Sequence, residues 1–138
     1  MTVIYFVASK GDEEHTKICE QIVQYLGRYG KVETEHLRKL DVLVAEVTNP
    51  STRVGFDIGK VIEGNNWLSQ HDQRRILCLY RSPDKEFFQR LSRLGDPVLV
   101  NSGFNLEEYS STEEARKSID DFFKNRTPRN QRNTFPLI

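Results

Sequence analysis

The sequence predicts an α/β fold, with a doubly wound sheet of five mainly parallel strands in the order 2-1-3-4-5 and helices on both faces. Short apolar segments alternate along the chain with longer segments of helical periodicity. Two short segments, 2–8 and 41–47, are almost continuously apolar, which is typical of parallel strands buried on both faces. The 138 residues suffice for one hydrophobic core, and no internal repeat is visible. We therefore expect one α/β domain over residues 1–126 and a polar C-terminal tail over 127–138.

The first half of the predicted sheet begins at residues 2–8, where apolar and β-branched side chains fill a strand. A helix is predicted over 13–29 and ends before Gly30, because apolar residues recur there every three or four positions. These residues are Ile18, Ile22, Val23 and Leu26. Residues 31–35 form a second, more polar strand, which we place at an edge of the sheet.

The third strand, 41–47, is central, and a turn on Asn-Pro-Ser leads from it into a helix over 54–70. Ser51 or Thr52 is the expected N-cap of this helix. Its buried side chains are predicted to be Val54, Ile58, Val61 and Ile62. The segment Arg-Ile-Leu-Cys-Leu-Tyr, residues 75–80, forms the fourth strand.

The last third of the chain has shorter patterns. They predict a helix over 85–94, a fifth strand over 97–100 and a final helix over 112–124. Thr112 is the expected cap of the final helix, with Glu113 and Glu114 in its first turn, where the helix dipole favours acidic side chains.

One connection in this scheme is too short. The second strand ends near residue 35 and the third begins near residue 41, whereas a parallel pair needs a crossover of about a dozen residues. Either the second strand is not parallel, or the chain lacks a crossover segment.

The composition argues against several classes of protein. Twenty basic and 20 acidic residues balance to zero, whereas nucleic-acid binding relies on a basic excess. The two cysteines lie far apart, and the three histidines have no Cys or His at ligand spacing, so we expect neither disulfides nor a metal site. No apolar run approaches about 18 residues and no signal peptide is visible. We expect a cytoplasmic protein, with the nucleus as the alternative, that binds neither nucleic acid nor membrane.

Two predicted loops meet where the strand order reverses, which is where sheets of this kind bind ligands. They are the loop Ser9-Lys10-Gly11 and residues 48–53. The following helix start offers free N–H groups for a phosphate, and Arg53 adds a positive charge. Gly55 lets a ligand approach the backbone, and Asp57 lies about one turn inside the helix. The arrangement favours a phosphorylated substrate that Asp57 attacks or orients; the alternative is an ordinary capped helix start.

Four segments, taken in order, resemble the family of 2'-deoxynucleoside 5'-phosphate N-hydrolases, in the nucleoside 2-deoxyribosyltransferase superfamily. They are IYFVASKG, RYGKVETEH, LDVLVAEVTNPSTRVGFDIGKVIE and ILCLYR, and they extend from Ile4 to about Arg81. The most specific part is AEVTNPS followed by Val-Gly, an aromatic residue, an acid, an aliphatic residue and Gly.

The resemblance implies cleavage of the N-glycosidic bond of deoxynucleoside 5'-monophosphates, without metal or cofactor, to give free base and deoxyribose 5-phosphate. A carboxylate attacks the anomeric carbon, and water then hydrolyses the glycosyl intermediate. Asp57 matches the nucleophile and Tyr5 an active-site tyrosine. The implied substrate- and phosphate-binding residues are Ser9, Lys10, Gly11, His36, Ser51, Arg53 and Gly55. The family further implies a homodimer, in which Gln89 or Ser92 of the partner subunit contacts the phosphate.

The sequence departs from the family pattern at three places. The family nucleophile is Glu, so Asp57 is one methylene shorter, by about 1.5 Å. The first loop is one residue shorter, with Lys10 in place of an arginine and Asp12 nearby. Residues 37–40 replace a longer family segment that covers the substrate and carries a second acid. A non-catalytic nucleotide-binding relative is therefore the alternative function.

Two other functions of sheets with this strand order fit the sequence less well. A signalling receiver domain needs an acidic pair after strand 1 and an Asp at the end of strand 3, where this chain has Ser9-Lys10 and Glu46. A flavin site needs a first loop rich in hydroxyl groups and glycine, unlike Ser-Lys-Gly-Asp-Glu-Glu.

Overall fold

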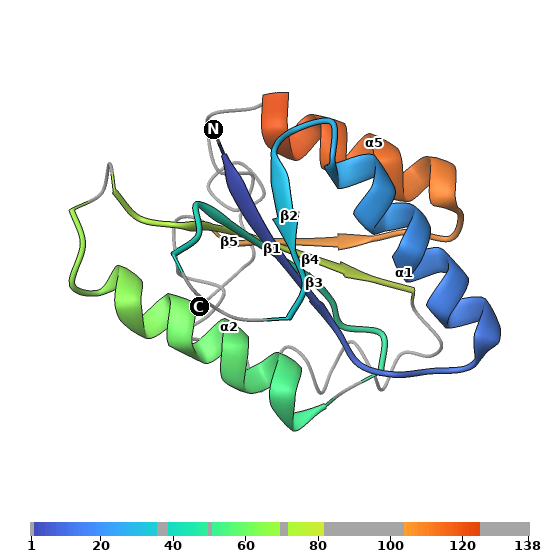
Figure 1. The fold of residues 1–138 in the computed structure, drawn as a ribbon, viewed down its shortest axis with the longest axis horizontal. Coiled ribbons are helices and arrows are strands. Elements are labelled where there is room, and N and C mark those ends of the chain that lie inside the picture. The colour runs from blue at the N-terminus through green and yellow to red at the C-terminus, as the bar shows by residue number, and fades with distance from the viewer. Residues whose placement is uncertain (1, 36–38, 50, 70–71, 82–103, 125–138) are drawn as a thin grey trace, which may run out of the picture.

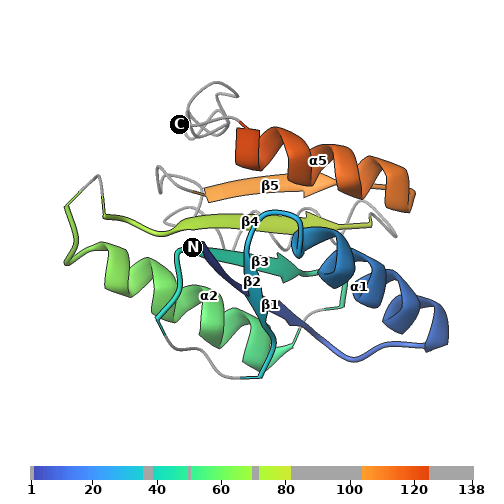
Figure 2. The ribbon, with the colours of Figure 1, turned by 45° about the horizontal axis from the view of Figure 1, so that its top comes forward.

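The computed structural model describes residues 2–35, 39–49, 51–69, 72–81 and 104–124. Its centre is a five-stranded sheet in the order β2-β1-β3-β4-β5, in which every pairing is parallel. The strands are β1 (Val3–Ala8), β2 (Lys31–Glu33), β3 (Val42–Glu46), β4 (Arg75–Tyr80) and β5 (Phe104–Glu108). Helices α1 (Glu13–Leu26) and α5 (Thr112–Lys124) cover one face, and α2 (Thr52–Asn65) covers the other (Figures 1 and 2). The predicted fold class and strand order are confirmed.

The two faces of the sheet carry separate hydrophobic cores, because successive side chains of a strand point to opposite faces. Tyr5 and Val7 of β1 pack with Val54 and Val61 of α2. Their neighbours Ile4 and Phe6 pack on the opposite face, against side chains of α1 and α5 that include Ile22, Leu26, Ile119 and Phe122. The direction of each β1 side chain therefore decides which helix it meets.

Strands β2 and β3 flank β1 and both pair with it in parallel, so the first of the two alternatives, a second strand that is not parallel, is wrong. Glu33 at the end of β2 lies opposite Tyr5, and Val42 at the start of β3 lies opposite its neighbour Ile4. The connection therefore crosses about 10 Å laterally but returns by only about one residue along the strands. Residues 34–41 can span about 26–29 Å when extended. A longer crossover is needed only when a connection must return along a full strand.

Several predicted boundaries need correction. Helix α1 ends at Leu26, three residues before the predicted end. Helix α2 begins at Thr52 and ends at Asn65. Its end is fixed because the buried Asn65 side chain accepts a hydrogen bond from Arg74 N–H and donates one to the Arg74 carbonyl, which turns the chain toward β4.

The C-terminal elements also differ from the prediction. Strand β5 is Phe104–Glu108, a segment for which no strand was predicted. The helix predicted over 85–94 and the strand predicted over 97–100 lie outside the described residues. Helix α5 has the predicted bounds, but Ser111 rather than Thr112 caps it, since Ser111 Oγ accepts from Glu114 N–H at 3.2 Å.

Gly30 stands before β2 because the chain passes very close to the start of β1. A Cβ at Gly30 would lie 2.2 Å from the carbonyl oxygen of Thr2, the same oxygen that accepts from Lys31 N–H at 2.9 Å.

Among the described residues, no helix is long and apolar enough to cross a membrane.

Candidate active site

The loops after β1 and β3 meet at the carboxyl end of the sheet, as the strand order predicts. The Ser9 hydroxyl donates to the Asn49 carbonyl and joins the two loops. Gly11 lies beneath this contact, where a Cβ would come within 2.7 Å of the His15 ring and 2.8 Å of the Asn49 amide nitrogen. The first loop therefore needs glycine at this position for close packing.

A buried tyrosine–carboxylate pair lies under these loops, on the α2 face of the sheet. The Tyr5 hydroxyl donates to Asp57 Oδ2 at 2.9 Å, and the two side chains are 2% and 7% exposed. Tyr5 reaches this face from β1 by strand alternation, whereas Asp57 shares the buried face of α2 with Val54 and Val61, at helical spacing. The structure thus brings together the two residues that the family resemblance assigns to catalysis.

The Arg53 guanidinium completes the electrostatics of this pair. Burial raises the pKa of Tyr5 above its ordinary value; the nearby Arg53 lowers this pKa, and the hydrogen bond to the Asp57 carboxylate raises it. The pKa of Arg53 is itself raised, chiefly by its interaction with Tyr5. Because the pKa of Tyr5 is raised overall, its hydroxyl stays protonated and remains a hydrogen-bond donor to the carboxylate.

The N-terminus of α2 presents several donors to the same region. Ser51 is the N-cap, and its Oγ accepts from Val54 N–H at 3.1 Å, which leaves the hydroxyl proton available to a ligand. Within the described residues, the backbone N–H groups of Thr52 and Arg53 have no partner, as expected for the first turn of a helix. These donors suit an anion.

The other predicted site residues differ in how the structure places them. Lys10 is exposed on the first loop. Gly55 is exposed as well, and a Cβ there would meet no atom within 4 Å, so space beside this turn is open. Ser9 is engaged with Asn49, so its proton would have to be redirected to reach a ligand. His36, Gln89 and Ser92 lie outside the described residues.

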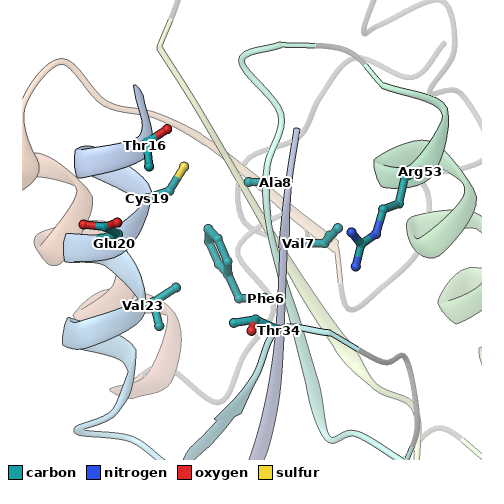
Figure 3. Close-up of a pocket in the computed structure, with 9 residues that line it drawn as sticks. All are labelled: Phe6, Val7, Ala8, Thr16, Cys19, Glu20, Val23, Thr34 and Arg53. Carbon is teal, nitrogen blue, oxygen red and sulfur yellow. The ribbon is translucent and has the colours of Figure 1, made fainter. Parts of the chain in front are cut away.

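A cavity of about 400 Å³ runs along the edge of β1 next to this site. Among the described residues, β2 pairs with Val3–Tyr5, so the rest of this edge of β1 borders the cavity. Figure 3 shows Phe6 and the side chains of α1 on one side of β1 and Arg53 of α2 on the other. Arg53 therefore belongs both to the cavity wall and to the surroundings of Tyr5.

A second group of buried polar side chains, on the opposite face, was missed by the sequence analysis. Glu46, fully buried at the end of β3, accepts from Thr48 N–H at 2.6 Å, from Thr48 Oγ1 at 2.9 Å and from the Tyr109 hydroxyl. The buried His15 contacts Arg81 Nη2 at 2.6 Å. An acidic residue inside an apolar strand was the signal available in the sequence for Glu46.

In the described part of the chain, no group of three or more His, Cys, Asp or Glu could hold a metal.

Curated proteins similar to this chain carry closely related names. The "Putative 2'-deoxynucleoside 5'-phosphate N-hydrolase 1" of Trichoplax adhaerens is 32% identical, over 91% of this chain and 96% of that protein. The protein with the same name from Nematostella vectensis is 30% identical, over 77% and 84%. Human 5-hydroxymethyl-dUMP N-hydrolase is 33% identical over 56% of each chain. No family model matches the chain.

The similarity to the Trichoplax protein extends over 150 residues, which is more than the 138 of this chain. That relative therefore has residues without a counterpart here, which fits the expectation of a shortened segment. Among solved structures, the response regulator DrrB of Thermotoga maritima aligns with 93% of this chain and 55% of its own, with a TM-score of 0.54. At 12% identity this likeness shows the shared fold alone.

Proposed function

Because the chain belongs to the family of 2'-deoxynucleoside 5'-phosphate N-hydrolases, we propose that it hydrolyses the N-glycosidic bond of a 2'-deoxynucleoside 5'-monophosphate. The proposal rests on one observation above all, the buried Tyr5–Asp57 pair, which lies about one turn inside a helix whose N-terminus presents free donors. The products are the free base and deoxyribose 5-phosphate.

Asp57 is the proposed nucleophile. Its Oδ2 accepts from Tyr5, which leaves Oδ1 to form a bond to the anomeric carbon. The bond to the base breaks as this bond forms; the base leaves with the electron pair and takes a proton from water. A water molecule then attacks the anomeric carbon of the glycosyl ester, loses a proton to solvent and releases the carboxylate. Protonated Tyr5 keeps the carboxylate oriented during both steps.

The substrate phosphate is proposed to lie at the N-terminus of α2. The Ser51 hydroxyl and the N–H groups of Thr52 and Arg53 supply hydrogen bonds there, and Lys10 adds positive charge from the first loop. The cavity beside Arg53 has room for the base, since about 400 Å³ lies within the usual range for small-molecule sites. Arg53 links the three parts of the site.

A second candidate is a relative that binds nucleotides but no longer cleaves them. Two observations favour it: Asp57 is shorter than the glutamate expected at this position, and the Trichoplax relative has residues that this chain lacks. A misplacement of about 1 Å at a reacting atom can cost about 10²-fold in rate.

Incubation with each deoxynucleoside 5'-monophosphate, followed by chromatographic detection of free base, tests the proposal. We expect release of base from at least one nucleotide, and none from the Asp57→Asn variant. Calorimetric binding of nucleotide without base release from the unmodified protein would establish the second candidate instead.

The family resemblance also leads us to propose a cytoplasmic homodimer. Sedimentation equilibrium at micromolar concentration should give about twice the mass of 16.1 kDa. A monomer that is fully active would contradict the dimer, and a nuclear signal in fractionated cells would contradict the location.

A further inference from the structure

His15 is tied to both ends of the first loop. Its ring nitrogen Nε2 lies 3.1 Å from the carbonyl oxygen of Ser9, where the loop begins. Its backbone N–H donates to Asp12 Oδ1 at 2.8 Å, where the loop enters α1. Gly11, between these ends, packs against the same ring. A single residue thus spans the loop that carries three of the predicted binding residues.

The hydrogen-bond partners of the imidazole indicate its tautomer. Arg81 is always a donor, and its Nη2 lies 2.6 Å from Nδ1, so Nδ1 is the acceptor. Nε2 therefore carries the proton and donates it to the Ser9 carbonyl. Cys19 Sγ lies 3.6 Å from Nε2 as a further neighbour. Both nitrogens of this 2% exposed imidazole have hydrogen-bond partners. Nε2 links it to Ser9 after β1, and Nδ1 links it to Arg81 after β4.

These contacts belong to a closed cycle of interactions that connects the residues following β1, β3 and β4. Arg81 N–H donates to Thr48 Oγ1 at 2.9 Å, and the Thr48 hydroxyl donates to the buried Glu46 at 2.9 Å. Asn49, the residue after Thr48, accepts from the Ser9 hydroxyl. The chain of contacts returns from Ser9 through His15 to Arg81. An apolar side chain at residue 15 could fill the same volume but could not form the hydrogen bonds to Ser9 and Arg81.

We propose that His15, oriented by Arg81, is a positioning residue that fixes the loop of residues 9–12 in the arrangement that receives the 5'-phosphate of the substrate. This proposal rests on the proposed function, because it assumes a phosphate between the first loop and the start of α2. His15 itself does not touch the substrate. Its loss therefore weakens binding of the nucleotide and leaves binding of the matching nucleoside unchanged.

Two substitutions separate the bond to Ser9 from the bond to Arg81. His15→Gln can place its amide nitrogen where Nε2 lies and keep the donor to the Ser9 carbonyl. His15→Asn can place its amide oxygen near Nδ1 and keep the acceptor for Arg81, but it cannot reach Ser9. Tyr25→Phe, which removes a hydrogen bond from Tyr25 to Asp120 near the other end of α1, is the matched control.

Calorimetry with a deoxynucleoside 5'-monophosphate and with its nucleoside provides the main measurement. We expect His15→Asn to weaken nucleotide binding about tenfold, as for loss of one buried hydrogen bond, with nucleoside binding unchanged. His15→Gln and Tyr25→Phe should stay within about threefold of the unmodified protein. Amide hydrogen exchange at residues 10–12 should accelerate in His15→Asn and not in His15→Gln. Arg81→Met, at a half-buried position, should weaken nucleotide binding in the same direction and serves if His15→Asn does not fold.

The possible failures are distinguishable. If the unmodified protein binds nucleotide and nucleoside equally, the phosphate site of the proposed function is wrong, and this inference falls with it. If the unmodified protein prefers the nucleotide but His15→Asn and Arg81→Met keep that preference, the proposed function stands and the role of His15 is refuted. Equal losses for nucleotide and nucleoside would also refute it, because they would indicate general damage to the fold.

Discussion

Asp57 holds its carboxylate against Tyr5, in a site almost closed to water. The hydrogen bond of 2.9 Å comes from a residue on β1, so strand β1 and the helix α2 jointly define where the carboxylate lies. A carboxylate this buried needs its donors, because an unpaired charge away from water is costly. At the residue scale, the site is a pair rather than a single acid.

Asp57→Asn keeps the shape of the side chain and removes its charge. We expect base release to vanish while nucleotide binding persists, because the phosphate contacts at the start of α2 are untouched. An assay of base release checks the loss of turnover, and calorimetry on the same preparation checks that nucleotide binding persists. Unchanged turnover would show that another residue is the nucleophile.

Asp57→Glu adds one methylene and extends the carboxylate by about 1.5 Å. If the rest of the site is complete, base release should increase, since the longer side chain restores the reach expected for the family. No change would instead favour a defect in the connection before β3, which the family resemblance predicts to be shortened.

Tyr5→Phe keeps the aromatic ring and removes the hydroxyl that donates to Asp57 and also interacts with Arg53. The hydrogen bond to a charged group is worth about 1.5–3 kcal/mol, so the rate constant for base release should fall about 10- to 150-fold, with nucleotide affinity nearly unchanged. Steady-state kinetics gives kcat and KM separately. A rise in KM with constant kcat would mean that Tyr5 binds substrate rather than orienting the nucleophile.

At the element scale, the start of α2 combines two tasks in one residue. Ser51 caps the helix through its oxygen and retains its proton for a ligand. The sequence indicated the cap of this helix, because Ser51 was one of the two expected N-caps, but it placed the first helical residue at 54 instead of Thr52. The corrected ends of α1 and α2 depend on contacts made across the fold, such as that between Asn65 and Arg74, which no local pattern contains.

Substitutions at Ser51 separate these two tasks. Ser51→Asp keeps a capping acceptor but places a negative charge where the phosphate is proposed to bind, so stability should hold while nucleotide affinity falls at least tenfold. Ser51→Ala should lose about 1 kcal/mol of stability together with some affinity. Urea denaturation and calorimetry check these outcomes. Tight nucleotide binding by Ser51→Asp would place the phosphate elsewhere.

At the scale of the whole molecule, the strand order was predictable because alternating apolar runs and helical periods leave few topologies. The family resemblance assigned catalysis to Tyr5 and Asp57, and the structure adds that these two side chains are in contact and buried. The position of β5 was not predictable, since Phe-Asn-Leu-Glu-Glu is too polar to suggest a strand. The contacts that join His15, Arg81 and Glu46 could not be predicted either, because they connect residues from distant parts of the sequence.

The folded chain also holds the protons of its tyrosines and cysteines more tightly than the unfolded chain does. The pKa of every one of the five tyrosines is raised, in Tyr29 to about 12 by burial and by its bond to Asp120. Burial raises the pKa of Cys19 to about 12 and raises that of Cys78 as well. In the unfolded chain these groups lose their protons near their ordinary values of 9.0 and 10.0. Above pH 9 the folded state therefore binds more protons, and the free energy of unfolding must fall as pH rises.

Stability should accordingly be flat between pH 7 and about pH 9 and decline steadily toward pH 12, with the cysteines responsible for the first part of the decline. Urea denaturation in reducing buffer, at half-unit steps from pH 7 to 11, measures this profile. In the double variant Cys19→Ala and Cys78→Ala, stability at pH 7 will be lower because buried volume is lost, but the onset of the decline should move from about pH 9 to about pH 10. Tyr25→Phe with Tyr29→Phe should leave the onset in place and make the decline above pH 10 shallower. A profile that stays flat to pH 11, or one in which removing both cysteines leaves the onset unchanged, would show that burial in this fold does not hold these protons as the structure implies.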